Sequence, residues 1–334
     1  MYSYILHFSF CCALLCCTSY IFAQKTTIIS TNIAEDKPKS IENIKIRKSR
    51  KINAIPELLH LPIHLFKLKN QKFQNLHIES VAYGKHKRQK MLICESKTVS
   101  PYQNEIIFFI HGGGWSIGKP EQHLAMAELL TNAGYRVILP GYRLSKEVDF
   151  EAMNEDIQIA FKTGITYLQK MKGIDNFKVV VGGASAGCSL GALLVFDKDV
   201  QIKHKIPSHI FAGFFSLAGV LSLDEMPQTK GLKRYAGEKG QATFISASPV
   251  NHIDGQIQVP VLCIHGAKDG LVAAETAQRF MNTLCLHQCD KSEFYLIDGG
   301  SHIGAATQWC YNRRKDYGQK AIILRWLHQL KKSA

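Results

Sequence analysis

The stretch Gly183-Ala184-Ser185-Ala186-Gly187 decides how this sequence folds and where its chemistry lies. A Val-rich run at 177–181 precedes it and a helical pattern at 186–196 follows it, so the stretch joins a strand to a helix. Two glycines let the strand and helix backbones approach closely, and such a turn leaves the Ser185 side chain exposed above the carboxyl end of the strand. The five residues alone would be an ordinary turn of small residues. Their position between strand and helix indicates a nucleophile.

The rest of the chain alternates between strand and helix patterns. Alternating residues at 77–83 and 89–94 predict an antiparallel hairpin. Buried strands are then predicted at 105–110, 136–139, 177–181, 209–217, 260–264 and 293–297. Helices are predicted at 121–133, 150–171, 186–196, 273–286 and 305–330, the last with a break near Gly318. This order predicts an α/β protein in which a mostly parallel, doubly wound sheet follows an N-terminal antiparallel hairpin, with a short insertion at 221–253.

A glycine-rich loop, His111-Gly112-Gly113-Gly114-Trp115, follows the predicted strand at 105–110. Three consecutive glycines allow backbone N–H groups to point into one small space, where they can stabilise the oxyanion that forms on an attacked carbonyl. The alternatives are a flexible glycine turn and a phosphate-binding loop. The sequence lacks the Lys-Ser/Thr pair that follows the glycines of a phosphate loop, which argues against that alternative.

Asp269 and His302 lie just beyond the last two predicted strands. A serine hydroxyl is a poor nucleophile until a base removes its proton. A histidine can act as that base near neutral pH, and a carboxylate can orient its ring and stabilise the imidazolium. The chain order Ser185, Asp269, His302 therefore predicts a catalytic triad.

Together these motifs resemble the HGGG-type esterases of the hormone-sensitive-lipase and acetyl-esterase branch of the α/β-hydrolases. The resemblance extends from about His77 to the C-terminus and implies the α/β-hydrolase fold. It also implies an oxyanion hole made by the backbone N–H groups of Gly113, Gly114 and Ala186.

Two further segments are similar to that family, and two features depart from it. Tyr142-Arg143-Leu144 resembles the family's segment after the fourth strand, and Ser248-Pro249-Val250 resembles the segment before the acid-bearing strand. The family often has a proline after the acid, whereas this chain has Asp269-Gly270-Leu271-Val272. The N-terminal cap helices of many lipase-like members are not evident, so the enzymes that act on small esters are closer.

The resemblance implies a serine carboxylesterase that hydrolyses small acyl esters through an acyl-enzyme, with acetyl or aryl-acyl groups on carbohydrate among the candidate substrates. Two alternatives stay open. One is an amidase similar to an aryl-formamidase, and the other is a catalytically inactive hydrolase fold used for binding. An inactive protein would be expected to lack a member of the triad, and none is missing.

The first residues have the composition of a targeting segment. An apolar run without charged side chains ends at the small residue Ala23, which predicts a signal peptide at 1–23, cleavage before Gln24, and export to the periplasm or the extracellular space. The segment has no Lys or Arg near Met1, so an uncleaved membrane anchor is the alternative. A lipid anchor on Cys16 or Cys17 is disfavoured because Leu15 or Cys16 would lie where a small residue is needed.

Charge is concentrated after this segment. Residues 35–90 carry 14 Lys and Arg against 5 Asp and Glu, which is +9 of the formal charge of +14. Residues 24–70 are therefore predicted to be a basic arm before a catalytic domain at 71–334. Such an arm can contact an anionic surface weakly or act as a solvated tether. No nucleic-acid-binding module is present, and the oligomeric state stays open.

Cys94 and Cys263 lie in apolar strand-like runs, and Cys188 opens a predicted helix. All three are expected to be small buried residues. Cys285 and Cys289 are four residues apart at a helix end and, in an oxidising compartment, can pair with each other or with Cys310. No spacing resembles a zinc site, and we expect neither a metal nor another cofactor.

Several polar residues near the motifs are expected to be structural. His111 is predicted to hold the glycine loop, and His265 to be a hydrogen-bonding support for the loop that carries the acid. Trp115 is predicted either to form the floor of an acyl pocket or to pack under the loop. Glu121 and His123 are predicted to be solvated residues at a helix start.

Overall fold

The structure is a computed structural model that describes residues 54–69, 71–102, 104–174, 176–287, 289–307, 310, 316 and 318–331. These residues belong to one compact unit that spans residues 40–334. The predicted signal peptide and the basic arm up to residue 53 lie outside the described residues. No helix in the described ranges is both long and apolar enough to cross a membrane.

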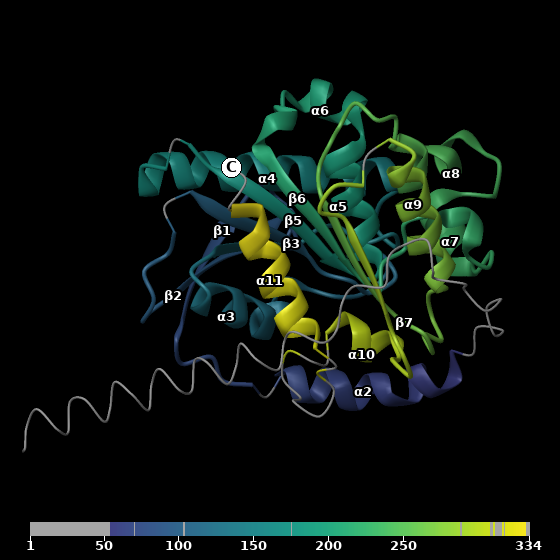
Figure 1. Cartoon of the computed structure of the whole chain (residues 1–334), viewed down its shortest axis with the longest axis horizontal. Helices are drawn as coiled ribbons and strands as arrows, with labels where there is room; N and C mark the ends of the chain where they lie inside the picture. Colours follow the sequence, from purple (N-terminus) through teal and green to yellow (C-terminus); the bar gives the residue numbers. More distant parts are fainter. Residues whose placement is uncertain are drawn as a thin grey trace, which may run out of the picture. The chain divides into compact units, whose positions relative to one another are not determined.

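The described strands form one eight-stranded sheet in the order β1-β2-β4-β3-β5-β6-β7-β8 (Figure 1). The strands are β1 Leu76–Ala82, β2 Lys90–Ser96, β3 Glu105–Ile110, β4 Arg136–Pro140, β5 Lys178–Ala184, β6 Phe211–Leu217, β7 Val261–Gly266 and β8 Glu293–Ile297. The β1–β2 and β2–β4 pairs are antiparallel, and all the other pairs are parallel. This confirms the predicted hairpin and the mostly parallel sheet.

The order of the strands creates a topological switch point near the centre of the sheet. From β3 the chain continues to β4 on one side and later returns to β5 on the other side. Loops that leave the carboxyl ends of two such strands diverge, and the space between them is where open α/β sheets bind ligands. The glycine loop follows β3 and the Ser185 turn follows β5, so both motifs lie at this point.

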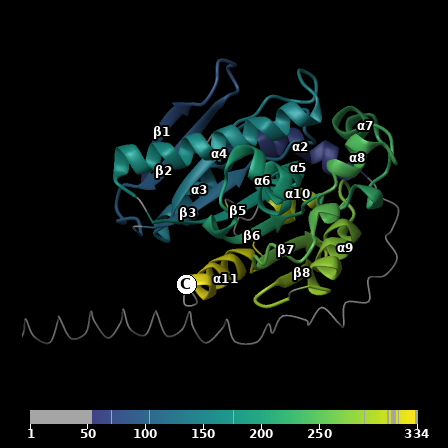
Figure 2. The same cartoon turned by 90° about the horizontal axis from the view of Figure 1, so that it is seen from above.

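Helices cover both faces of the sheet. They are α2 Ile55–Lys69, α3 Leu124–Asn132, α4 Phe150–Lys172, α5 Ala186–Phe196, α6 Lys198–His204, α7 Lys230–Ala236, α8 Ala242–Ser246, α9 Ala274–Cys285, α10 His302–Ala306 and α11 Gln319–Lys331. Buried residues of α4, α5 and α9 form one hydrophobic core, and those of α3, α10 and α11 form the other. Figure 2 shows α4 and α11 on opposite sides of the sheet.

The strand β3 shows why the sequence gives two cores. Side chains alternate across a strand, so Ile106 and Phe108 enter the core under α4 and α5, whereas Ile107 and Phe109 enter the core under α3 and α11. All four side chains are buried. A strand that is buried on both faces reads as a continuous apolar run, and the prediction of this strand at 105–110 is confirmed.

Helix boundaries follow local signals where those are present. The Asp149 side chain accepts a hydrogen bond from the N–H of Ala152 at the start of α4, and Gly173 ends that helix with a φ of 64°. The predicted helix at 305–330 is wrong in its extent, but its predicted break near Gly318 coincides with the start of α11. The short helix α10 begins at His302, and Thr307 leaves the helical conformation with a φ of −151° before α11 begins at Gln319.

The predicted insertion lies between β6 and β7. It contains α7, α8 and the short 3-10 turns Leu223–Glu225 and Pro249–His252. The sequence analysis missed α6, whose start is capped by the Asp197 side chain through the N–H of Val200. Cys285 and Cys289 form a disulfide, whereas Cys310 is unpaired. Cys94, Cys188 and Cys263 are buried thiols, as predicted.

Candidate active site

Ser185 occupies the sharp turn between β5 and α5. Its φ of 53° lies in the left-handed region that most residues avoid, which is typical of a nucleophile turn. A Cβ on Gly183 would come within 2.7 Å of the backbone of α5, and a Cβ on Gly187 would lie 2.2 Å from the carbonyl oxygen of Ile110. Both glycines are therefore required for the close approach of strand, helix and glycine loop.

Three predicted site residues form a continuous chain of hydrogen bonds. Oγ of Ser185 lies 3.0 Å from Nε2 of His302, and Nδ1 of His302 lies 2.8 Å from Oδ2 of Asp269. The carboxylate can only accept, so the Nδ1–H of His302 donates to it and Nε2 is left to accept from the serine hydroxyl. The side chains of Asp269 and His302 are buried, and Ser185 is half-buried beyond the carboxyl end of β5.

The acid is held by its own loop. Oδ1 of Asp269 accepts hydrogen bonds from the N–H groups of Leu271 and Val272 at 2.9 and 2.8 Å. Oδ2 also lies 3.2 Å from Nε2 of His265, on the preceding strand β7. The segment 269–272, which has no proline, therefore fixes the carboxylate through its backbone amides. His265 contacts the same carboxylate, as predicted.

Neighbouring charges and burial shift the pKa values of Asp269 and His302 in opposite directions. Burial alone would raise the pKa of Asp269, but the neighbouring His302 and the hydrogen bonds from His265 and His302 hold that pKa well below its ordinary value. Burial alone would lower the pKa of His302, but the charge and hydrogen bond of Asp269, together with the charge of Glu57, raise it. The site thus keeps an ionised carboxylate beside an imidazole that can take up a proton.

The glycine loop lies against the serine turn. A Cβ on Gly112 would lie 3.0 Å from Cβ of Ser185. The carbonyl oxygen of Gly113 accepts the N–H groups of Ser116 and Ile117, which folds the loop back on itself. Within the described part of the chain, the N–H groups of Gly113, Gly114 and Ala186 have no carbonyl partner. Amides without a carbonyl partner are free to donate to an oxyanion, and the assignment of these three stays a prediction.

His111 and Trp115 hold this loop from below. Nδ1 of His111 donates to the carbonyl oxygen of Gly112 at 2.8 Å, the ring stacks on Tyr142, and burial lowers the pKa of His111 to about 4. The Trp115 indole is buried, stacks on Tyr235 at 4.1 Å between ring centroids, and donates to Oγ of Ser189. Trp115 is thus packed against α5 and α7, and its role as the floor of an acyl pocket stays a prediction.

The prediction for His123 is wrong. The 3-10 turn Pro120–His123 precedes α3 and directs His123 inward, where it is buried against Phe109 with a centroid distance of 5.1 Å. Glu121 is partly exposed and lies 3.4 Å from Lys90. The first residues of the predicted helix at 121–133 form a 3-10 turn instead, and α3 begins at Leu124.

One residue of the site was missed. The carboxylate of Glu57, on α2, accepts a hydrogen bond from the backbone N–H of His302 at 2.5 Å. The two residues are 245 positions apart, and no local motif marks Glu57. The sequence predicts only a basic arm over these residues, and the contact arises from the packing of α2 against α10.

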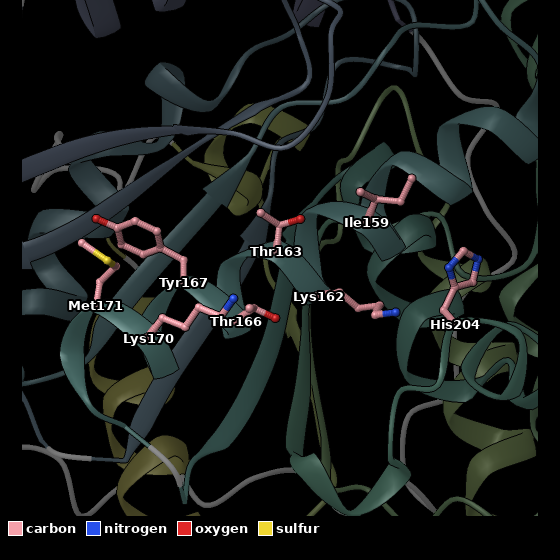
Figure 3. A pocket seen from close by; sticks show the side chains of 8 residues that line it. All are labelled: Ile159, Lys162, Thr163, Thr166, Tyr167, Lys170, Met171 and His204. Atoms are coloured by element: carbon pink, nitrogen blue, oxygen red, sulfur yellow. The ribbon is translucent and has the colours of Figure 1, made fainter.

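A surface pocket is lined by side chains other than those of the triad. Figure 3 shows that its lining comes from α4, with His204 from α6 beside it. No predicted site residue is among the lining side chains, which are Ile159, Lys162, Thr163, Thr166, Tyr167, Lys170, Met171 and His204. Across the described residues, no cluster of three or more His, Cys, Asp or Glu could hold a metal ion.

Residues 93–284, which include β3, the glycine loop, Ser185 and Asp269, match the model of the BD-FAE family. The chain belongs to the BD-FAE family. His302 lies beyond the matched range, so its assignment rests on the contacts described above.

The chain is also similar to a curated deacetylase. The chain is 35% identical over 122 residues to the arylacetamide deacetylase of Oryctolagus cuniculus, an alignment that covers 33% of this chain and 30% of the relative. The chain therefore matches about a third of that curated relative's length.

Solved structures show the same fold. An esterase of the bacterial hormone-sensitive-lipase family aligns with a TM-score of 0.62 at 19% identity, over 81% of this chain and 89% of the other. A truncated carbohydrate esterase from gut microbiota aligns with a TM-score of 0.64 at 18% identity, over 78% of this chain and 99% of the other. The BD-FAE chain thus has the α/β-hydrolase fold of esterases and lipases, as the motifs predicted.

Proposed function

We propose that this protein is a serine carboxylesterase that hydrolyses small acyl esters through an acyl-enzyme. The observation that carries the proposal is the hydrogen-bonded chain from Ser185 through His302 to Asp269. These three side chains come from loops after β5, β7 and β8, and they meet beside the glycine loop after β3. Such convergence of a nucleophile, a base and an orienting acid supports acyl transfer.

In the acylation step, Oγ of Ser185 attacks the carbonyl carbon of the ester while its proton moves to Nε2 of His302. Asp269 stabilises the imidazolium that forms, because its carboxylate stays ionised beside Nδ1. The carbonyl oxygen becomes an oxyanion, and the N–H groups of Gly113, Gly114 and Ala186 donate to it.

The tetrahedral intermediate then collapses. The bond to the leaving oxygen breaks, and that oxygen takes the proton from Nε2 of His302, so the alcohol departs and the acyl group stays on Ser185. In the second half, water gives a proton to His302 and attacks the acyl carbon. Release of the carboxylic acid returns the proton to Ser185 and restores the resting state.

The packing beside the nucleophile supports a small acyl group. Ser189 lies one helical turn after Ser185 on α5, and its hydroxyl accepts from the Trp115 indole. Trp115 stacks on Tyr235, and both rings are buried. This aromatic pair packs one turn along α5 from Ser185, and in this proposal it limits the length of the acyl chain.

For the alcohol part and the compartment, the support is the N-terminal sequence together with the likeness to a carbohydrate esterase. We include in the proposal an exported enzyme with a signal peptide at 1–23, an arm at 24–70 and a catalytic domain at 71–334. Acetyl or aryl-acyl groups on carbohydrate are the proposed substrates, and the basic arm is proposed to contact anionic surfaces weakly.

A fluorophosphonate probe tests the enzyme proposal directly. The folded wild-type protein should be labelled, and Ser185→Ala should not be. Acetylated sugars, feruloylated sugars and N-formylkynurenine should then be compared as substrates. Faster turnover of N-formylkynurenine would favour the amidase alternative, and a folded protein without labelling would favour the inactive binding protein.

A further inference from the structure

The helix α2 contacts the part of the chain that carries His302. It precedes the sheet in sequence, yet it lies against α10, the short helix that begins at His302 (Figure 1). Two polar contacts join the helices. The Glu57 carboxylate accepts from the N–H of His302, and Nε2 of His64 lies 3.2 Å from Oγ1 of Thr307. These contacts lie at the beginning of α10 and directly after its end.

The contact between Glu57 and His302 supplies a hydrogen-bond acceptor to the first turn of α10. The first N–H groups of a helix have no carbonyl partner within the helix. Ser301 accepts the N–H of Gly304 at 3.1 Å. Glu57 accepts the N–H of His302 at 2.5 Å, and its other oxygen lies 3.5 Å from the N–H of Ile303. Without Glu57, two buried amides at the start of the helix would lose their acceptor.

The backbone that Glu57 holds also sets the position of the imidazole. The ring of His302 must place Nδ1 on Asp269 and Nε2 on Ser185 at the same time. A small rotation of the first turn of α10 would move both nitrogen atoms away from their partners. The Glu57 side chain is buried, with 6% of its surface exposed, so its contact with this turn is shielded from water.

Glu57 also adds negative charge beside the base. The groups that face His302 are Asp269 from the loop after β7, Glu57 from α2 and the hydroxyl of Ser185. His265 acts on Asp269 from β7. The two carboxylates raise the pKa of His302 against the effect of burial. They therefore favour the imidazolium, which is the form that His302 takes during the reaction.

We propose that Glu57 is a positioning residue that couples α2 to the active site by holding the backbone of His302 and stabilising its protonated ring. Its role in turnover rests on the proposed function. The arm before the catalytic domain then supplies a part of the catalytic unit, although Glu57 does not touch the reacting atoms.

Two substitutions in the full chain separate hydrogen bonding from charge. Glu57→Gln keeps an oxygen acceptor and removes the charge, whereas Glu57→Ala removes both. We expect Glu57→Ala to lower kcat about tenfold to a hundredfold with little change in KM, because misplacement of the base affects the chemical step. Glu57→Gln should retain most of the wild-type kcat. In its plot of kcat/KM against pH, the ascending limb should lie at lower pH than in the wild type. Leu59→Gln, on an exposed position of the same helix, is the matched control.

A measurement that does not depend on turnover distinguishes this proposal from the esterase proposal. The pKa of His302 is read by NMR, with its signals assigned by their loss in His302→Ala. A lower pKa in Glu57→Gln supports the positioning role even if the wild-type protein hydrolyses no ester, a result that would contradict only the esterase proposal. An unchanged pKa in Glu57→Gln, or wild-type kcat in a folded Glu57→Ala variant, would overturn the positioning role.

Discussion

Nδ1 of His302 and Oδ2 of Asp269 lie 2.8 Å apart, and the other carboxylate oxygen of Asp269 is bound by two backbone amides of its own loop. The carboxylate is therefore fixed on one side by the backbone and directed with the other side toward the histidine. Burial opposes ionisation of Asp269, but the charge of His302 and the hydrogen bonds from His265 and His302 hold the pKa of Asp269 well below its ordinary value. This arrangement makes Asp269 the first residue to test.

Replacement of Asp269 with Asn is expected to lower kcat by about 10⁴-fold, because an amide neither stabilises the imidazolium nor enforces the Nδ1–H tautomer. The measurement is steady-state hydrolysis of p-nitrophenyl acetate. Asp298→Asn is the matched control, since Asp298 is exposed in the loop that leads to His302. Activity of Asp269→Asn within tenfold of the wild type would mean that another acid orients the base.

The pH dependence follows from the direction of the His302 shift. The base must be neutral to accept the serine proton, so kcat/KM should rise as the pH rises through the pKa of His302. Asp269 and Glu57 raise that pKa above its ordinary value of 6.5. The midpoint of the ascending limb should therefore lie above pH 6.5. A midpoint below 6.5 would show that burial outweighs the two carboxylates.

The raised pKa of His302 affects the stability of the fold in the direction opposite to its effect on activity. A histidine whose pKa is raised by folding binds its proton more tightly in the folded state. Its contribution to the free energy of unfolding is fully present below the ordinary pKa of 6.5 and is lost as the pH rises through the folded value. The contribution of His302 to stability thus decreases over the range in which activity increases.

Much of the site could be predicted because its signals are local. The turn around Ser185 and the loop at Gly113 are short motifs placed just after buried strands, and parallel strands direct such motifs to one edge of the sheet. Pairing between Glu57 and His302 could not be predicted, because it depends on how α2 docks across 245 residues of chain. The burial of His123 depends likewise on the direction of a turn that leaves no periodic pattern.

Substitution by alanine is expected to affect activity differently at Gly113 and at Gly114, the two proposed oxyanion glycines. A Cβ on Gly113 would lie 2.1 Å from the carbonyl oxygen of Ile117, and its φ of 123° is strained for any L-residue. Gly114 has a φ of 55° and no heavy atom within 4 Å of such a Cβ. Gly113→Ala should therefore displace the loop and lower kcat by about 10²–10³-fold, as expected for loss of an oxyanion donor.

Gly114→Ala should have the smaller effect, since only the left-handed backbone conformation opposes it, at a cost of about 1–2 kcal/mol. Steady-state rates together with thermal unfolding separate a displaced loop from an unfolded protein. Gly240→Ala, at a φ of 89° with open space around the Cβ, controls for backbone strain away from the site. Equal rates for Gly113→Ala and the wild type would argue against this loop as the oxyanion hole.

The stacked pair of Trp115 and Tyr235 provides a test of acyl-chain selectivity. Tyr235 is buried on α7, and its ring covers the indole that packs one turn below Ser185. Tyr235→Ala should open space there, and each methylene that becomes buried contributes about 0.8 kcal/mol. The ratio of kcat/KM for p-nitrophenyl hexanoate to that for the acetate should therefore rise about tenfold or more.

Tyr235→Phe keeps the ring and should keep the wild-type ratio, which separates the effect of space from that of the hydroxyl. Thermal unfolding of Tyr235→Ala is needed beside the kinetics, because removal of a buried aromatic side chain costs about 3–5 kcal/mol. A folded Tyr235→Ala variant with an unchanged hexanoate-to-acetate ratio would place the acyl pocket on another side of Ser185. If the wild-type protein prefers esters with long acyl chains, the small-acyl assignment itself is contradicted. The aromatic pair would then line a pocket that already accepts long chains.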